Sequence, residues 1–175
     1  SSAFEGKTGF NEDISAWDTS SVLDMSQMFY DARAFNQNVS GWAVGGVTNM
    51  SQMFRKARDF DQNIGAWHTA SVQDMSYLFY QAKAFNGDIT SWDTSNVTTM
   101  SRMFAGTDAF NQDISGWDTA NVTDMDAMFY YAKAFNQDLS GWCVSKISVA
   151  PNSFDTNAFA WTNDQWRPKW GDDCP

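Results

Sequence analysis

The sequence has few basic side chains, a single histidine, two cysteines and no long apolar run, and each shortage excludes a class of protein. Its 11 Lys and Arg against 21 Asp and Glu leave a net charge of −10. Nucleic acid and anionic membranes would repel such a chain, so neither is expected as a partner. A membrane-spanning helix needs about 18 or more consecutive apolar residues, and the sequence contains no such run, so direct membrane insertion is not expected.

The motifs of catalysis are missing as well. The chain contains no glycine-rich phosphate loop, no pair of metal-binding histidines and no nucleophile elbow. His68 stands where other repeats carry Asp18, Asp93 and Asp118, which indicates a solvated turn residue. Carboxylate pairs are numerous, but the repeat generates them, and no pair is set apart as acid–base catalysis requires. We therefore expect a protein that is not an enzyme.

What the chain does contain is a repeat of 25 residues. Each of six phenylalanines is followed seven residues later by a tryptophan: Phe10 and Trp17, Phe35 and Trp42, Phe60 and Trp67, Phe85 and Trp92, Phe110 and Trp117, Phe135 and Trp142. This period is typical of repeat proteins, in which each unit covers the apolar face of its neighbour. Seven units then begin at Ser1, Ser26, Ser51, Ser76, Ser101, Asp126 and Pro151.

The two ends of the array depart from the repeat. Residues 1–150 are expected to form a six-unit array, of which 1–25 is a degenerate N-terminal unit with Lys7 where later units place alanine. That end is expected to continue upstream or to pair end to end with a second copy. Residues 151–175 are expected to form a degenerate seventh unit and C-terminal cap, because Phe159 and Trp166 each fall one residue early.

Both cysteines lie near this cap. A disulfide between Cys143 and Cys174 would staple the cap onto the array. Such a bond persists in oxidising surroundings, so the pair indicates an extracellular protein.

Within one unit, the apolar spacing predicts a short helix. Met25, Met28, Phe29 and Ala32 follow the i, i+3, i+4, i+7 pattern of one buried stripe. The next segment, 36–40, reads as a brief parallel strand. The Phe and Trp columns are expected to pack in the core, with an exposed aromatic ladder that grips a sugar or peptide as the alternative. An internal amide ladder that bonds to the backbone of adjacent turns is expected at Asn11, Asn36, Asp61, Asn86, Asn111 and Asn136.

The unit Phe110 to Met125, which reads Phe-Asn-Gln-Asp-Ile-Ser-Gly-Trp-Asp-Thr-Ala-Asn-Val-Thr-Asp-Met, resembles the BspA-like bacterial surface protein repeat, a relative of the leucine-rich repeats. The resemblance implies an α/β solenoid: a right-handed, leucine-rich-repeat-like coil of seven 25-residue units, each a short strand plus a short helix. It also implies an extracellular or cell-surface location, with adhesion or protein binding as the activity and no catalytic residues.

The positions on either side of the Ile14 column should point outward and form two polar rows. The acidic or amide row is Asp13, Asn38, Asn63, Asp88, Asp113 and Asp138, and the hydroxyl row is Ser15, Ser40, Thr90, Ser115 and Ser140. We call these two rows the polar strip and predict that it docks a protein or glycan on another cell or matrix. A solvated surface without a ligand is the alternative.

Two further functions stay open from the residues. The carboxylates of Asp88, Asp113 and Asp138 repel one another, so a calcium ion could screen them and make adhesion calcium-dependent, although no EF-hand-like loop is present. A partial threonine column could order water and bind ice: Thr19, Thr69, Thr94 and Thr119, interrupted by Val44 and Val144.

Overall fold

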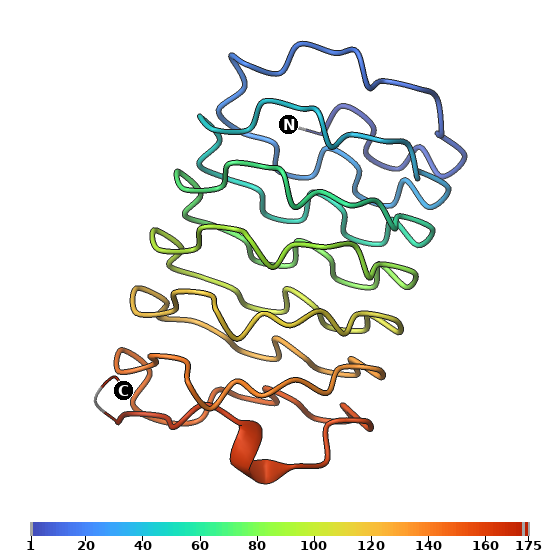
Figure 1. The fold of residues 1–175 in the computed structure, drawn as a ribbon. Coiled ribbons are helices and arrows are strands. Elements are labelled where there is room, and N and C mark those ends of the chain that lie inside the picture. The colour runs from blue at the N-terminus through green and yellow to red at the C-terminus, as the bar shows by residue number, and fades with distance from the viewer. Residues whose placement is uncertain (1, 173, 175) are drawn as a thin grey trace.

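The chain winds into a stack of coils, seen from the blue N-terminal end to the red C-terminal end in Figure 1. The structure is a computed structural model that describes residues 2–172 and 174. Equivalent residues of neighbouring coils lie 25 positions apart, and isolated parallel bridges join them in one continuous row: Asp24, Asn49, Asp74, Thr99 and Asp124. The backbones of neighbouring coils are therefore paired in register at this position.

The expected α/β solenoid of strand plus helix units is wrong. Within the described residues the named element is a single 3-10 helix, η1, Asp164–Trp166, near the C-terminal end of the stack (Figure 1). The bridges are single residue pairs, so they do not make strands. Residues 36–39 are irregular, and 26–31 consists of turns.

Consecutive β-turns take the place of the predicted helix. The N–H of Met28 donates to the carbonyl of Met25 at 3.3 Å, and the N–H of Ala32 to the carbonyl of Phe29 at 3.0 Å, which closes two four-residue turns. The third residues of these turns, Gln27 and Asp31, have φ of 58° and 57°, the sign that type II turns require. Two such turns bury the same i, i+3, i+4, i+7 positions as a helix, so the apolar pattern does not distinguish them.

Bonding between coils explains why the turns are preferred. Four N–H groups of one coil donate to carbonyls of the next at 2.8–3.0 Å: Met25 to Asn49, Gln27 to Ser51, Phe29 to Met53, and Asp31 to Arg55. In a helix these N–H groups would bond to carbonyls of the same coil, and a helix this short is marginal in water. Among the residues that the structure describes, twelve non-glycine residues have φ between 53° and 62°, which costs about 1–2 kcal/mol for each.

Stacked phenylalanine rings fill the centre of the coils. Two columns are 0% exposed: Phe29, Phe54, Phe79, Phe104 and Phe129, and Phe35, Phe60, Phe85, Phe110 and Phe135. Ring centroids lie 3.8–4.1 Å apart between the columns and 5.4–5.9 Å apart along them. The prediction that the Phe column is core is confirmed.

The tryptophans form a third buried column with a polar contact of its own. From Trp42 to Trp142 they are 2–4% exposed, and each indole N–H donates at 3.0–3.2 Å to the carbonyl 28 residues earlier. Trp17, in the first coil, is 50% exposed. The tryptophan therefore both fills the core and bonds its coil to the preceding one.

The predicted amide ladder is present, although its side chains lie at or near the surface. The Oδ1 atom of each of the first five members, Asn11 to Asn111, accepts the backbone N–H of the equivalent residue one coil later at 2.8–2.9 Å. Side-chain amides thus supply the contacts between coils where the segment 36–40 was expected to form a strand.

The last coil ends the aromatic stack by turning a ring on edge. One extra residue enters here, because the N–H of Ala127 donates to the carbonyl of Asn152, 25 positions on, instead of the usual 24. Phe159 is 65% exposed, and Trp161 occupies the core, edge-on to Phe129 and Phe135 at 5.4 and 4.9 Å. An edge-on ring presents no flat face for another coil to stack on.

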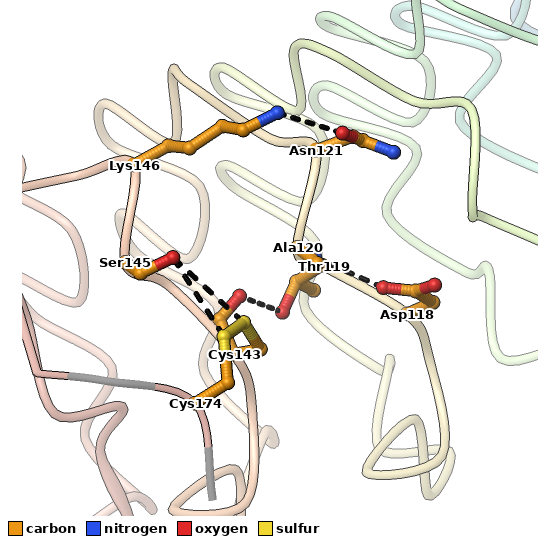
Figure 2. Close-up of a disulfide and its surroundings, with 8 residues drawn as sticks. All are labelled: Asp118, Thr119, Ala120, Asn121, Cys143, Ser145, Lys146 and Cys174. Atoms are coloured by element: carbon orange, nitrogen blue, oxygen red, sulfur yellow. Dashed lines mark hydrogen bonds between the residues drawn. A yellow bond between two sulfur atoms is a disulfide. The ribbon is translucent and has the colours of Figure 1, made fainter.

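The predicted disulfide joins Cys143 to Cys174, with Cα atoms 4.7 Å apart. Figure 2 shows it beside Thr119, whose hydroxyl donates to the Cys143 carbonyl at 2.7 Å. The bond ties the end of the chain to the sixth coil.

Replacing Trp92 by Phe is expected to lower the free energy of unfolding by about 1–3 kcal/mol, because the Ile64 carbonyl loses the indole donor and the core loses volume. Urea denaturation measures the difference. Trp17→Phe is the matched control, since its side chain is half-exposed, and its effect should be much smaller. Equal losses in the two variants would contradict the role given to the indole bond.

The variant Cys143→Ser/Cys174→Ser is expected to lose about 3–4 kcal/mol, since the bond closes a sequence separation of 31 residues in the unfolded chain. The loss should concentrate in the last coil, where the Leu139 N–H donates to the Trp166 carbonyl. Hydrogen exchange at Leu139 then accelerates before exchange in earlier coils. Unchanged protection at Leu139, or two free thiols by mass spectrometry of the unreduced protein, would refute this.

Candidate functional site

The polar strip lies on the surface, and its acidic or amide members each close a turn. In all six the Oδ1 atom accepts the backbone N–H two residues on at 2.9–3.1 Å, as Asp88 does from Thr90 and Asp138 from Ser140. These six side chains are exposed, and the hydroxyl row beside them is exposed or half-buried. The structure therefore brings the two rows together, and it gives the first a local structural role.

These turn bonds also set the acidity of the strip. The backbone N–H of Thr90 is the largest cause that lowers the pKa of Asp88, and a hydrogen bond from the Ser115 side chain is the largest for Asp113. The pKa of Asp138 is lowered chiefly by the Ser140 side chain, against a smaller opposing effect of the Asp113 charge. Mutual repulsion along the row is thus weaker than the bonds that hold each carboxylate.

The structure favours neither the calcium site nor the ice-binding surface. Across residues 2–172 and 174, no three Asp, Glu, His or Cys side chains gather closely enough to hold a metal ion, so Asp88, Asp113 and Asp138 do not converge on a calcium position. The threonine column is buried. Thr19, Thr69, Thr94 and Thr119 are 1–4% exposed and donate to carbonyls of the next coil at 2.7–3.0 Å. These threonines do not form an outer surface that could face ice.

A second surface, which the sequence reading missed, follows the turns of the coils. We define the turn segments as residues 25–34, 50–59, 75–84, 100–109 and 125–134, and the loop segments as the fifteen residues that follow each of them together with 10–24. The turn segments carry seven basic and four acidic side chains, a net charge of +3. The loop segments carry one basic and twelve acidic side chains, a net charge of −11. The acidic chain therefore has a cationic band along its turns.

All five tyrosines of the chain lie in the turn segments: Tyr30, Tyr77, Tyr80, Tyr130 and Tyr131. The Arg55 guanidinium lies 5.0–5.2 Å from the ring centroids of the first three. The Arg102 guanidinium lies 5.4 Å from the Tyr77 ring and donates to its hydroxyl at 2.5 Å. Cation–π contacts of this kind arrange rings and charges into one surface.

Two cavities open on this surface and share one wall. The first, of about 350 Å³, is lined by Tyr80, Tyr130 and Tyr131 with Lys83 and Lys133 among others. The second, of about 290 Å³, shares Tyr130 with the first and is lined by Arg102 and Asp126 among others. The first volume falls at the lower end of the range for small-ligand sites, and aromatic walls with a few charged groups are typical of them. A charge count by repeat position would have found this surface in the sequence.

Stacked coils of 25 residues that share one aromatic core make this a repeat protein. Residues 1–77 and 62–166 match the protein family described as "Mycoplasma protein of unknown function, DUF285", and the chain belongs to that family. Its description names no activity, and it does not name the BspA-like repeat. No curated protein and no solved structure matches the chain. Among the described residues, no helix has the length and apolar character needed to cross a membrane.

The turn bonds of the polar strip predict how stability depends on pH. A carboxylate whose pKa is lowered by folding contributes stability above its ordinary pKa, near 3.8, and this contribution is lost as the pH falls through the lowered value. The variant Asp88→Asn/Asp113→Asn/Asp138→Asn keeps the turn acceptor, as Asn38 does, without a titrating group. Its melting temperature should therefore fall less than that of the wild type between about pH 5 and pH 2. Parallel curves would contradict this origin.

Proposed function

We propose that the protein is a non-enzymatic, extracellular or cell-surface binding module that docks a protein or glycan on its outer surface. The observation that carries the proposal is the cationic, tyrosine-lined band of the turn segments, with its two adjoining cavities, on a chain of net charge −10. The side chains of the core columns are buried by packing or engaged in hydrogen bonds between coils, so only the outward-facing side chains are available to a ligand.

Two features support the location and the mode of action. The Cys143–Cys174 disulfide fits an oxidising environment. The resemblance of the repeat to BspA-like surface proteins points the same way and suggests adhesion as the biological role. The polar strip is the second candidate surface, since one carboxylate oxygen of Asp88, Asp113 and Asp138 is not used by the turn bond.

A binding screen tests the proposal and assigns the surface. The protein is applied to arrays of glycans and extracellular-matrix proteins, with millimolar calcium and with a chelator. Lys83→Glu/Lys133→Glu reverses two charges at the first cavity, and Asp88→Lys/Asp113→Lys/Asp138→Lys reverses the centre of the strip. We expect the first variant to lose binding by tenfold or more and the second to retain it.

The opposite result would assign the binding site to the polar strip and would still support a binding function. Absence of binding to every glycan and matrix protein, with and without calcium, would contradict the binding function. A stable monomer in sedimentation would separately exclude end-to-end pairing through the N-terminal coil, where Trp17 and Leu23 are 50% and 64% exposed.

A further inference from the structure

The first cavity is a notch left by one coil that lacks two side chains. At one outward position of the turn segments the coils carry Tyr30, Arg55, Tyr80, Ala105 and Tyr130 in succession. At the next position they carry Asp31, Lys56, Gln81, Gly106 and Tyr131. Only the Ala105–Gly106 pair has no long side chain, and the first cavity lies at this pair.

Gly106 contributes no side chain to the notch, although its backbone conformation is close to that of its equivalents in the other coils. Its φ is +71°, in the region that non-glycine residues enter at a cost, and an added Cβ would lie 3.1 Å from Cγ of Gln81. Gln81 itself has φ of 57°, so the backbone at this position accepts a side chain when one is present. The notch is thus a product of the two residue identities and not of a backbone irregularity.

Tyrosines from two different coils line the notch. Tyr80 and Tyr130 come from coils two steps apart, so their backbones are separated by about 10 Å. The cavity of about 350 Å³ is lined by both of these tyrosines. Tyr130 and Tyr131 are 38% and 40% exposed, so a ligand could reach them.

The rim of the notch carries excess positive charge. Lys83 and Lys133 both lie near the same oxygen of Asp108, at 3.2 and 3.1 Å, so two ammonium groups face one carboxylate. Their side chains are 41% and 53% exposed, and ion pairs this exposed are weak. A second carboxylate, brought by a ligand, would complete the charge balance without breaking a buried contact.

The second cavity extends the site beyond a single ring. It shares Tyr130 with the first cavity and is also lined by Arg102 and Asp126, which bond to Tyr77 and Asn152 respectively. A linear ligand with one ring in the notch would therefore place its next residue here. Alternating aromatic walls with charged and hydrogen-bonding groups suits a chain of hydroxylated rings.

We propose that the notch at Ala105–Gly106 binds an acidic saccharide of at least two residues. One pyranose ring lies between Tyr80 and Tyr130, its carboxylate meets Lys83 and Lys133, and the adjoining residue contacts Arg102. The inference rests on the binding function proposed above and specifies the ligand class and the site.

Calorimetric titration of the folded protein tests the proposal with four probes: a hexuronic acid tetramer, a sialylated oligosaccharide, a neutral hexose tetramer and a sulfated tetramer. We expect binding of a carboxylated probe, with an affinity for the neutral probe at least tenfold lower. The uronate and sialic acid arms identify which carboxylated sugar fits. Equal affinity for the neutral probe, or a preference for the sulfated one, would overturn the assignment of the rim.

Two variants test the notch directly. Ala105→Tyr introduces the ring found at Tyr80 and leaves Gly106 unchanged, because a side chain at Gly106 would be strained at φ of +71° and would crowd Cγ of Gln81. This variant should reduce affinity at least tenfold with a melting temperature close to the wild type. Tyr130→Ala removes a wall and provides an independent readout if the first variant does not fold. Retained affinity in either folded variant would overturn the site.

A charge-matched pair isolates the rim. Lys83→Gln/Lys133→Gln should weaken binding of the acidic probe at least fivefold, whereas Lys146→Gln/Lys169→Gln, which removes the same charge far from the notch, should not. An equal loss of affinity in the two double variants would show that only net charge matters, and it would refute the contact with Lys83 and Lys133. If no acidic saccharide binds while the arrays reveal another ligand, this inference fails and the binding module stands; if the arrays also reveal none, both fail.

Discussion

Hydrogen bonding between coils is the interaction on which the rest of this structure depends. In the turn segments, alternate N–H groups such as those of Gln27 and Phe29 donate to the next coil, and the N–H groups between them close β-turns within the coil. This division sets one fixed step per coil, which brings equivalent residues into columns. It also forces the left-handed conformation on residues such as Gln27, a local cost that the bonds to both neighbouring coils offset.

The same step determines which side chains are available for function. Inward columns must accept their own copy at a spacing of 5.4–5.9 Å, which flat phenylalanine rings do by stacking. Polar groups that point inward are used as bonds between coils, as the Trp92 indole and the Thr94 hydroxyl show. A site for a ligand would therefore have to lie on the outside, where a coil can change a residue without disturbing the inward columns. The Ala105–Gly106 notch is such a change.

Several features could be predicted from the sequence because they depend on periodicity alone. The phenylalanine and tryptophan columns, the amide ladder and the Cys143–Cys174 bond follow from which residues recur every 25 positions and which stand at the end. The helix and the strand were wrong for a physical reason. Two consecutive turns bury Met25, Met28, Phe29 and Ala32 as one helical stripe would, and propensity does not reveal a backbone bonded to another coil. Likewise, the spacing of the phenylalanine column points to Phe159, one residue early, but Phe159 is exposed and Trp161 is the buried ring at the end of the stack.

By itself, the sequence determined the repeat length, the inward columns, the disulfide partners and the uneven charge of the repeat positions, because all of these are properties of residue identity and spacing. Only the tertiary structure decided how each unit folds and where a ligand could fit. Backbone donors find their partners 24 residues on, and the notch has its walls on Tyr80 and Tyr130, 50 residues apart in the chain. Contacts between such distant residues arise only when the coils stack.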